Sequence, residues 1–174
     1  MNIELKKIGE DYWEFLMRHQ PTWATFLGDH RYDDQLDQRG EASRSDALSS
    51  HQSLLTRLKN VPTDDLNQQD KISYLILEHK LNEFIESLNH FDWEWNLDQL
   101  FGPHLHWLDI LNYHPLKAKK DFKTLLNRYH QIPVVMEQYL SDLKDGLKSG
   151  RVAPAIICER ILKQLKSFLN QKPL

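Results

Sequence analysis

The densest polar cluster of the chain lies just after a glycine at position 28. It contains three acidic residues, one histidine and one arginine: Asp29, His30, Arg31, Asp33 and Asp34. Carboxylates beside an imidazole could serve acid–base chemistry or bind a metal ion. The same residues could instead tie a loop together, because arginine pairs with carboxylates and aspartate caps free backbone N–H groups. The residues alone favour this second role, and the calcium-loop spacing Asp-x-Asp-x-Asp-Gly is absent.

A second group consists of His104, His106 and Asp109. Two imidazoles that are two residues apart on a helix point away from each other, so they cannot easily share one metal ion. His106 and Asp109 are three residues apart and can meet on one helix face. We expect a surface hydrogen bond between them rather than a metal site.

Aromatic residues gather in Trp93-Glu94-Trp95, with Trp107 further along the chain. Aromatic rings beside acids can bind sugars or cations, but more often they fill the space between helices, and packing is the prediction here. The single cysteine, Cys158, lies in an apolar run and is expected to be a small buried hydrophobic residue.

Several kinds of active site are missing from the sequence. None of the nine histidines is followed by glutamate, so the zinc-binding His-Glu-x-x-His helix is absent. There is no Gly-rich phosphate loop and no Gly-x-Ser-x-Gly motif. A net charge of -3 argues against nucleic acid as a partner, and no apolar run approaches the ~18 residues of a membrane span. The first residues lack the apolar segment of a signal peptide, which predicts a cytoplasmic protein unless a leader precedes them.

The elements that position these residues are predicted to be helices. Apolar residues recur three and four apart along nearly the whole chain, which is typical of amphipathic helices. A first helix carries Ile8 to Leu16 and ends before Pro21, while 29–45 is expected to be an ordered loop and 91–102 an aromatic connector. The other helices are expected over 22–27, 46–59, 69–89, 103–112, 117–131, 134–148 and from Pro154 onward.

The helix over 69–89 has the broadest apolar face and is predicted to be the central helix of a bundle. Its apolar residues are Ile72, Leu75, Ile76, Leu81, Phe84, Ile85 and Leu88. The chain of 174 residues fits one domain. We therefore predict an all-α array of about seven helices with short connections and no sheet.

Three stretches together resemble a bacterial family called domain of unknown function 885. They read PTWATFLGDHRYDD at 21–34, DQLFGPH at 98–104 followed by His114-Pro115, and LKSGRVAP at 147–154 followed by Glu159-Arg160 and Gln164-Leu165. The matches occur in the family's order and span nearly the whole chain. No single motif is decisive, but the ordered set is fairly specific.

The resemblance implies a zincin-type, metallopeptidase-like protein whose zinc site lies on a helix further downstream. Such a site needs two histidines on one helix face, a third ligand and a glutamate that activates water. No catalytic residue and no metal ligand can be placed on this sequence, so we expect no cofactor in this chain and zinc in the full-length protein. Residues 1–174 would then be a helical N-terminal domain, or a fragment of a longer chain, without an active site of its own.

In such folds the N-terminal helices form one wall of the substrate cleft. By that analogy, the substrate-cleft candidates are Asp29, His30, Arg31, Asp33, Asp34 and His104, with 29–34 and 101–104 facing the rest of the protein. The partners would be a C-terminal catalytic domain and a peptide substrate. This hypothesis predicts a large exposed apolar patch, through which the isolated chain would also form homo-oligomers.

Two other hypotheses compete with the cleft wall. The chain could be a stand-alone helical binding or scaffold domain without catalysis, which predicts a groove for a partner helix. It could also be a small metal-binding helical protein that uses His30, His104 or His106. The last is the weakest, because the sequence shows no ligand spacing that supports it.

Overall fold

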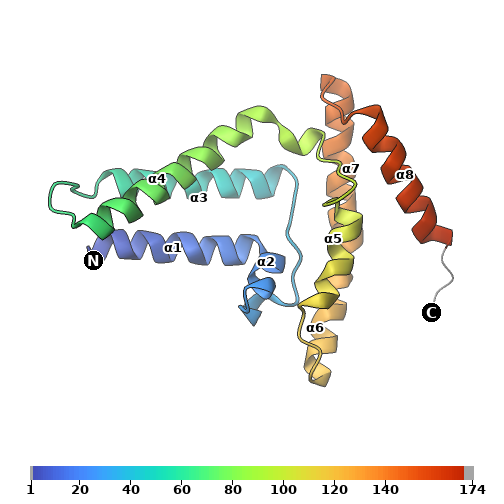
Figure 1. Cartoon of the computed structure of the whole chain (residues 1–174), viewed down its shortest axis with the longest axis horizontal. Coiled ribbons are helices and arrows are strands. Elements are labelled where there is room, and N and C mark those ends of the chain that lie inside the picture. The colour runs from blue at the N-terminus through green and yellow to red at the C-terminus, as the bar shows by residue number, and fades with distance from the viewer. Residues whose placement is uncertain (1, 171–174) are drawn as a thin grey trace.

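A computed structural model describes residues 2–170, and these residues form helices and no strand, so the predicted all-α fold is confirmed (Figure 1). The α-helices are α1 (Ile3–His19), α2 (Pro21–Phe26), α3 (Glu41–Lys59), α4 (Gln68–Ser87), α5 (Pro103–Asp109), α6 (Lys119–Tyr129), α7 (Ile132–Ser149) and α8 (Ala155–Asn170). Short 3-10 helices lie in the connections: η1 (His30–Tyr32), η2 (Leu88–His90), η3 (Asp92–Glu94) and η4 (Ile110–Asn112). Within the described residues, no helix is both long and apolar enough to cross a membrane.

Local sequence signals explain where several helices begin and end. Asn2 caps α1, because its side-chain oxygen accepts hydrogen bonds from two backbone N–H groups in the first turn. Asn67 caps α4 by accepting one hydrogen bond, from the backbone N–H of Asp70. Pro103 opens α5, since its fixed φ suits the first helical position. Gly150 has a φ of 78° and ends α7 in the left-handed conformation that glycine adopts without strain.

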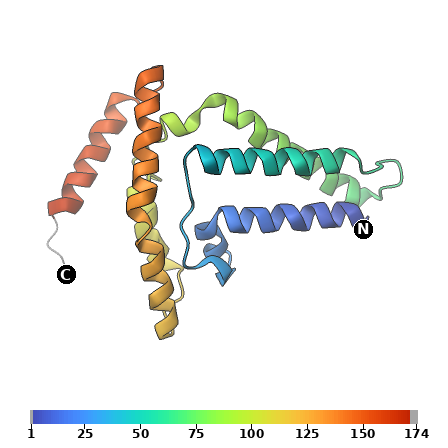
Figure 2. The same ribbon diagram turned by 180° about the vertical axis from the view of Figure 1, so that it is seen from behind.

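The helices form two groups that meet at an angle (Figures 1 and 2). Helices α1, α3 and α4 enclose one small core, made of Leu5, Ile8, Leu54, Leu58, Val61, Leu66, Leu77 and Leu81. Helices α5, α6 and α7 stand across the end of this group, and α8 extends away from the end of α7 (Figure 1). A second core lies here, made of Leu36, Ile110, Leu125 and Val135.

Helix α3 begins earlier than predicted. It starts at Glu41, whereas the sequence pattern placed residues 29–45 in a loop. The first turn of α3 is largely exposed and contains no large apolar residue, so it shows no apolar period. Its residues are nevertheless acceptable in a helix, and Gly40, with a φ of 88°, provides the turn before it.

Helix α4 is not the centre of a bundle, and this prediction was wrong. Leu77 and Leu81 are buried against α1 and α3, but three residues of the predicted apolar face are exposed. The exposed fractions are 42% for Ile72, 61% for Leu75 and 58% for Ile76. The periodicity identified residues that share a face, but no described element covers the part of that face beyond the small core.

Candidate functional site

On its exposed side, the polar loop after α2 is held together by ion pairs of Arg31 with acidic side chains. Arg31 Nε lies 2.9 Å from Asp29 Oδ1, and Arg31 Nη2 lies 2.6 Å from Asp29 Oδ2. The other guanidinium nitrogen, Nη1, donates to Glu14 of α1 over 2.7 Å. Hydrogen bonds from Arg31 lower the pKa of Asp29, so this carboxylate is ionised and engaged. Asp29 and Arg31 therefore fasten the loop to α1.

The inner side of the same loop carries a buried carboxylate. Asp33 is 7% exposed, and its Oδ1 accepts a hydrogen bond of 2.7 Å from Thr25 Oγ1. His30 Nδ1 lies 3.2 Å from Asp33 Oδ2. Asp33 also faces Arg128 of α6, whose Nη2 is 3.9 Å from Oδ1. Asp33 thus connects the loop with α2 and α6.

Arg128 is fully buried, and the sequence analysis missed it. Its Nη2 donates to Thr25 Oγ1 over 2.7 Å and to the carbonyl oxygen of Tyr32 over 2.8 Å. Burial lowers the pKa of Arg128, while the nearby Asp33 opposes that shift. A signal was present in the sequence, because Arg128 lies three residues after Leu125, on the face that the periodicity assigns to the core.

Beside this buried cluster lies a pocket of about 230 Å³. We call it the junction pocket, because it lies where α2 and the loop before α3 meet α5 and α7. Its lining residues are Thr22, Leu36, Asp37, Arg39, Phe101, Pro103, His106, Trp107, Val135 and Tyr139. Two of the three stretches that carry the family resemblance meet here. The stretch 21–34 contributes Thr22, and the stretch 98–104 contributes Phe101 and Pro103.

A chain of hydrogen bonds fixes the polar wall of the junction pocket. Asp37 accepts from the backbone N–H of Thr22 over 3.0 Å and from its hydroxyl over 2.5 Å, so Asp37 caps the start of α2. His106 Nε2 lies 3.2 Å from the same hydroxyl oxygen. Because the hydroxyl proton is given to Asp37, His106 Nε2 is the donor in this pair. Among the residues described, the partner of His106 is Thr22 and not the expected Asp109.

Arg39 also lines the junction pocket. Its guanidinium carbon lies 4.4 Å from the centroid of the Tyr139 ring, which is a cation–π contact. Burial raises the pKa of Tyr139, and the charge of Arg39 counteracts part of this shift. Within residues 2–170, no carboxylate oxygen lies within 4.0 Å of the Arg39 guanidinium.

The six predicted cleft residues do not line the junction pocket. Four of them, at 29–31 and 33, belong to the loop contacts described above. Asp34 contributes its carbonyl oxygen, which accepts a hydrogen bond of 2.6 Å from Gln131 Nε2. His104 points to α8, where its Nε2 lies 3.0 Å from Gln164 Oε1. The pocket is formed instead by their sequence neighbours, and the contact of any of the six with substrate stays a prediction.

The predicted packing holds for Trp93 and for Trp107, which packs against the second core, whereas Trp95 is 42% exposed. Trp93 lies under Arg44, whose guanidinium carbon is 4.4 Å from the ring centroid. Glu94 is buried at 7% exposure and accepts hydrogen bonds from Arg151 Nε over 2.7 Å and from Ser149 Oγ over 2.5 Å. Cys158 differs from its prediction, because it is only partly buried. Helix α8 packs on one side only, so its apolar run is not enclosed.

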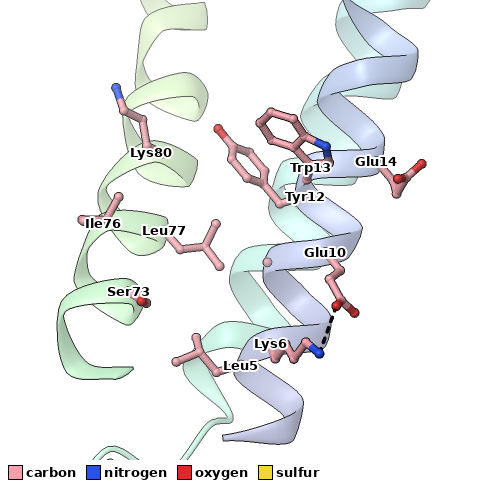
Figure 3. Close-up of a pocket in the computed structure, with 11 residues that line it drawn as sticks. Leu5, Lys6, Glu10, Tyr12, Trp13, Glu14, Ser73, Ile76, Leu77 and Lys80 are labelled. Carbon is pink, nitrogen blue, oxygen red and sulfur yellow. Dashed lines mark ion pairs between the residues drawn. The ribbon is translucent and has the colours of Figure 1, made fainter. Parts of the chain in front are cut away.

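A larger apolar groove of about 540 Å³ separates α1 from α4 (Figure 3). Leu5, Tyr12 and Leu77 project into it, while an ion pair of 3.6 Å between Lys6 and Glu10 lies on its rim (Figure 3). No atom lies within 4 Å of the position that a Cβ atom at Gly9 would take, so the groove is open there. Trp13 is 48% exposed and Ile76 is 58% exposed. We call this surface the α1–α4 groove.

Comparison with known proteins decides the family. A family model described as "Bacterial protein of unknown function (DUF885)" matches residues 21–174. The chain belongs to this family. The resemblance inferred from the three stretches is thus confirmed for the DUF885 family itself. No curated protein matches the chain significantly.

Solved structures match this DUF885 chain as well. One is described as a "putative lipoprotein of unknown function from Shewanella oneidensis", with a TM-score of 0.69 and 20% sequence identity. The match covers 79% of this chain and 25% of that protein's chain. At this identity the likeness shows a shared fold. The DUF885 chain therefore corresponds to about a quarter of the length of that relative.

The histidines of this DUF885 chain do not form a zinc site in the part that the structure describes. No group of three or more His, Cys, Asp or Glu residues is placed there so that it could hold a metal ion. The three histidines proposed for a small metal-binding protein have separate partners. His30 contacts Asp33, His104 contacts Gln164 and His106 contacts Thr22. The zinc implied by the resemblance does not fit these residues.

Proposed function

We propose that this chain is a helical wall of the substrate cleft in a zinc-dependent, peptidase-like DUF885 protein, and that it has no active site of its own. The observation that carries the proposal is the junction pocket. Two stretches that resemble the family, separated by more than 60 residues in the sequence, meet at this one pocket. The pocket combines apolar side chains with a few oriented polar groups, which is typical of ligand sites.

The open apolar surface supports a second part of the proposal. Ile76 lines the α1–α4 groove on α4 and Trp13 lines it on α1, and both are about half exposed. Ile72 and Leu75 add exposed apolar surface elsewhere on α4. Exposed apolar surface of this kind marks an interaction site in soluble proteins. Because the matched relative is much longer, we propose that the catalytic remainder of a full-length DUF885 protein packs against this groove. Zinc would be bound by that remainder.

The first test is to sequence the gene beyond the codon for Leu174. An open frame that encodes a helix with His-Glu-x-x-His-type ligands is expected, because such a helix can hold zinc and activate water. The full-length protein should then bind stoichiometric zinc and cleave peptides, and a chelator should remove both properties. A full-length protein that binds no zinc and cleaves no peptide refutes the peptidase proposal.

The contribution of the wall itself is tested by His106→Ala in the full-length protein. This change removes the donor that holds the Thr22 hydroxyl at the junction pocket. The KM for peptide should rise roughly fivefold, which corresponds to one ordinary hydrogen bond, while zinc content and kcat stay the same. His79→Ala on the exposed surface of α4 is the matched control and should leave KM unchanged. An unchanged KM in His106→Ala removes the junction pocket from the cleft.

The α1–α4 groove also favours an alternative, a stand-alone helical binding or scaffold domain. An amphipathic partner helix could place its apolar face between α1 and α4, as in other helix-in-groove complexes. A stop codon directly after Leu174, together with a monomeric chain that unfolds in one sharp transition, would favour this alternative. An unstable or self-associating chain would favour the cleft wall.

The cellular location also stays a proposal. The sequence predicts a cytoplasmic protein, whereas the relative from Shewanella oneidensis is described as a "putative lipoprotein". Fractionation of the native host, with detection of the full-length protein by antibody, separates the two. Recovery in the cytosolic fraction is the expected result, and recovery in the membrane fraction contradicts it.

A further inference from the structure

Arg39 differs from the other partly or fully buried arginines of residues 2–170 in having no acidic partner. Arg44 pairs with Asp142, Arg57 with Asp11, Arg128 with Asp33 and Arg151 with Glu94. Arg39 is half-buried as well, but its guanidinium contacts the Tyr139 ring instead of a carboxylate. A partly buried guanidinium without an acidic partner can take the carboxylate of a ligand as its partner.

The position of Arg39 is fixed before any ligand arrives. Its backbone N–H donates to Gln138 Oε1 over 2.7 Å, which ties the residue to α7. Its guanidinium carbon lies 4.4 Å from the centroid of the Tyr139 ring on the same helix. A guanidinium carries several N–H donors, so its contact with Tyr139 leaves others that can pair with both oxygens of a carboxylate. Such preorganisation lowers the entropy cost of binding.

The acid inside the junction pocket does not compete for Arg39. Asp37 accepts two hydrogen bonds from Thr22, and it lies more than 4.0 Å from the Arg39 nitrogens, since no ion pair forms between them. Its carboxylate is therefore committed to the start of α2. The remaining polar donor on that wall, His106, is aligned with the Thr22 hydroxyl. Arg39 is thus the one Lys or Arg side chain among the lining residues, and it shares the pocket with the Asp37 carboxylate, which is held by Thr22.

The rest of the pocket defines the body of the ligand. Leu36, Trp107 and Val135 supply apolar surface beside Arg39. The volume of about 230 Å³ corresponds to roughly eight water molecules at about 30 Å³ each, which suits one end of a peptide rather than a long segment. The complementary group is a carboxylate on a short, partly apolar body.

We propose that the junction pocket binds a peptide carboxylate, with Arg39 forming a bidentate pair to it. This inference rests on the proposed function, because it assigns to the cleft wall the recognition of a carboxylate on the peptide substrate. The carboxylate has two sources in a peptide, the C-terminus and an acidic side chain. Both present the same pair of oxygens to the guanidinium.

The test measures binding to the 174-residue chain by isothermal titration, so it needs neither zinc nor cleavage. Three short peptides with identical apolar residues are compared: one with a free C-terminus, one amidated, and one amidated with an internal glutamate. We expect the amidated peptide without glutamate to bind about ten- to a hundredfold more weakly than the better of the other two. Which of those two binds tightly identifies the source of the carboxylate.

Two variants show that Arg39 is responsible. In Arg39→Ala the preference for carboxylate peptides should disappear. In Arg39→Lys a small part of the preference should remain, because lysine keeps the charge but cannot form the bidentate pair. Arg160→Ala, an exposed arginine of α8, is the control and should keep the preference. Thermal unfolding of each variant confirms that the fold is retained. Equal binding of all three peptides, or an unchanged preference in Arg39→Ala, overturns the inference.

The two proposals fail in different ways. Peptide cleavage by the full-length protein without any preference for carboxylates would refute the role of Arg39 alone. Carboxylate-dependent binding to this chain, combined with a full-length protein that lacks zinc and cleavage, would refute the peptidase proposal and leave the carboxylate pocket in place.

Discussion

Replacing Arg128 with methionine should destabilise the fold, because the side chain is a buried cation that joins three segments. It is fully buried, and its Nη2 donates to Thr25 Oγ1 over 2.7 Å and to the Tyr32 carbonyl oxygen over 2.8 Å. Hydrogen bonds to a charged group contribute about 1.5–3 kcal/mol each, so the two together contribute about 3–6 kcal/mol.

An opposing effect reduces this loss. Arg128 Nε and Nη1 are buried without a hydrogen-bond partner among the described protein atoms. Removing these unsatisfied buried N–H groups stabilises the folded state by about 2–3 kcal/mol. Methionine also fills much of the same volume. Asp33 loses its cation but keeps the hydrogen bond from Thr25. The net result for Arg128→Met should be a loss of about 2 kcal/mol in the free energy of unfolding.

Urea unfolding followed by far-ultraviolet circular dichroism measures this loss. The midpoint should fall while the dependence on urea stays the same, because the surface exposed on unfolding does not change. Arg160→Met on exposed α8 is the control and should change the free energy of unfolding by less than about 0.5 kcal/mol. A variant as stable as the parent would refute the reasoning, because apolar packing would then outweigh the two charge-assisted bonds.

Three more predictions follow from the described contacts. Gly146→Ala should lower the free energy of unfolding by about 1–3 kcal/mol, since the new Cβ would press on the Glu94 carbonyl oxygen. Gly9→Ala places its Cβ in open space and should stabilise α1 by about 0.5–1 kcal/mol. Thermal unfolding of both variants checks this pair. Burial lowers the pKa of His51 in the folded protein, so the unfolded chain takes up a proton first as the pH falls. The contribution of neutral His51 to the free energy of unfolding is therefore complete above about pH 6.5. It is lost as the pH falls through the folded-state pKa. In His51→Leu, the difference in unfolding free energy between about pH 7.5 and about pH 5 should shrink, and an unchanged difference would contradict the assignment. The isolated chain should self-associate through its exposed apolar surface. In sedimentation experiments, Ile76→Glu should shift the chain toward the monomer. A parent chain that is monomeric at all concentrations contradicts this prediction.

Local sequence signals predicted the helices well wherever one residue type decides the backbone. Pro103 opened a helix and Gly150 ended one, because their backbone preferences hold in any surroundings. The start of α3 was missed because its first turn is polar and solvent-exposed, so apolar periodicity carries no information there. The burial of Ile72 and Ile76 was predicted wrongly for a related reason. Periodicity shows which residues share a face, but whether a neighbour covers that face is decided by the tertiary structure.

The candidate site was less predictable than the fold. The cluster at 29–34 attracted attention because its charges are adjacent in sequence, and adjacency is also what lets Asp29 and Arg31 neutralise each other. Arg39 carries no local signal, because its distinguishing feature is the absence of an acidic partner after folding. Its contact with Tyr139 joins residues 100 positions apart, which no sequence spacing could indicate.

The two groups of helices do not share one continuous core. The core of α1, α3 and α4 shares no residue with the core beside α5, α6 and α7. Charged contacts therefore connect the two groups: Arg44 of α3 donates to Asp142 of α7 over 3.0 and 2.9 Å. Such pairs fix geometry more than they add stability. The junction pocket lies beside the second core, since Leu36 and Val135 belong to both, and Asp37, Arg39 and His106 add its polar lining. The apolar surface needed for docking lies apart from it, on α1 and α4, which is why we assign ligand selection and domain docking to different elements of this chain.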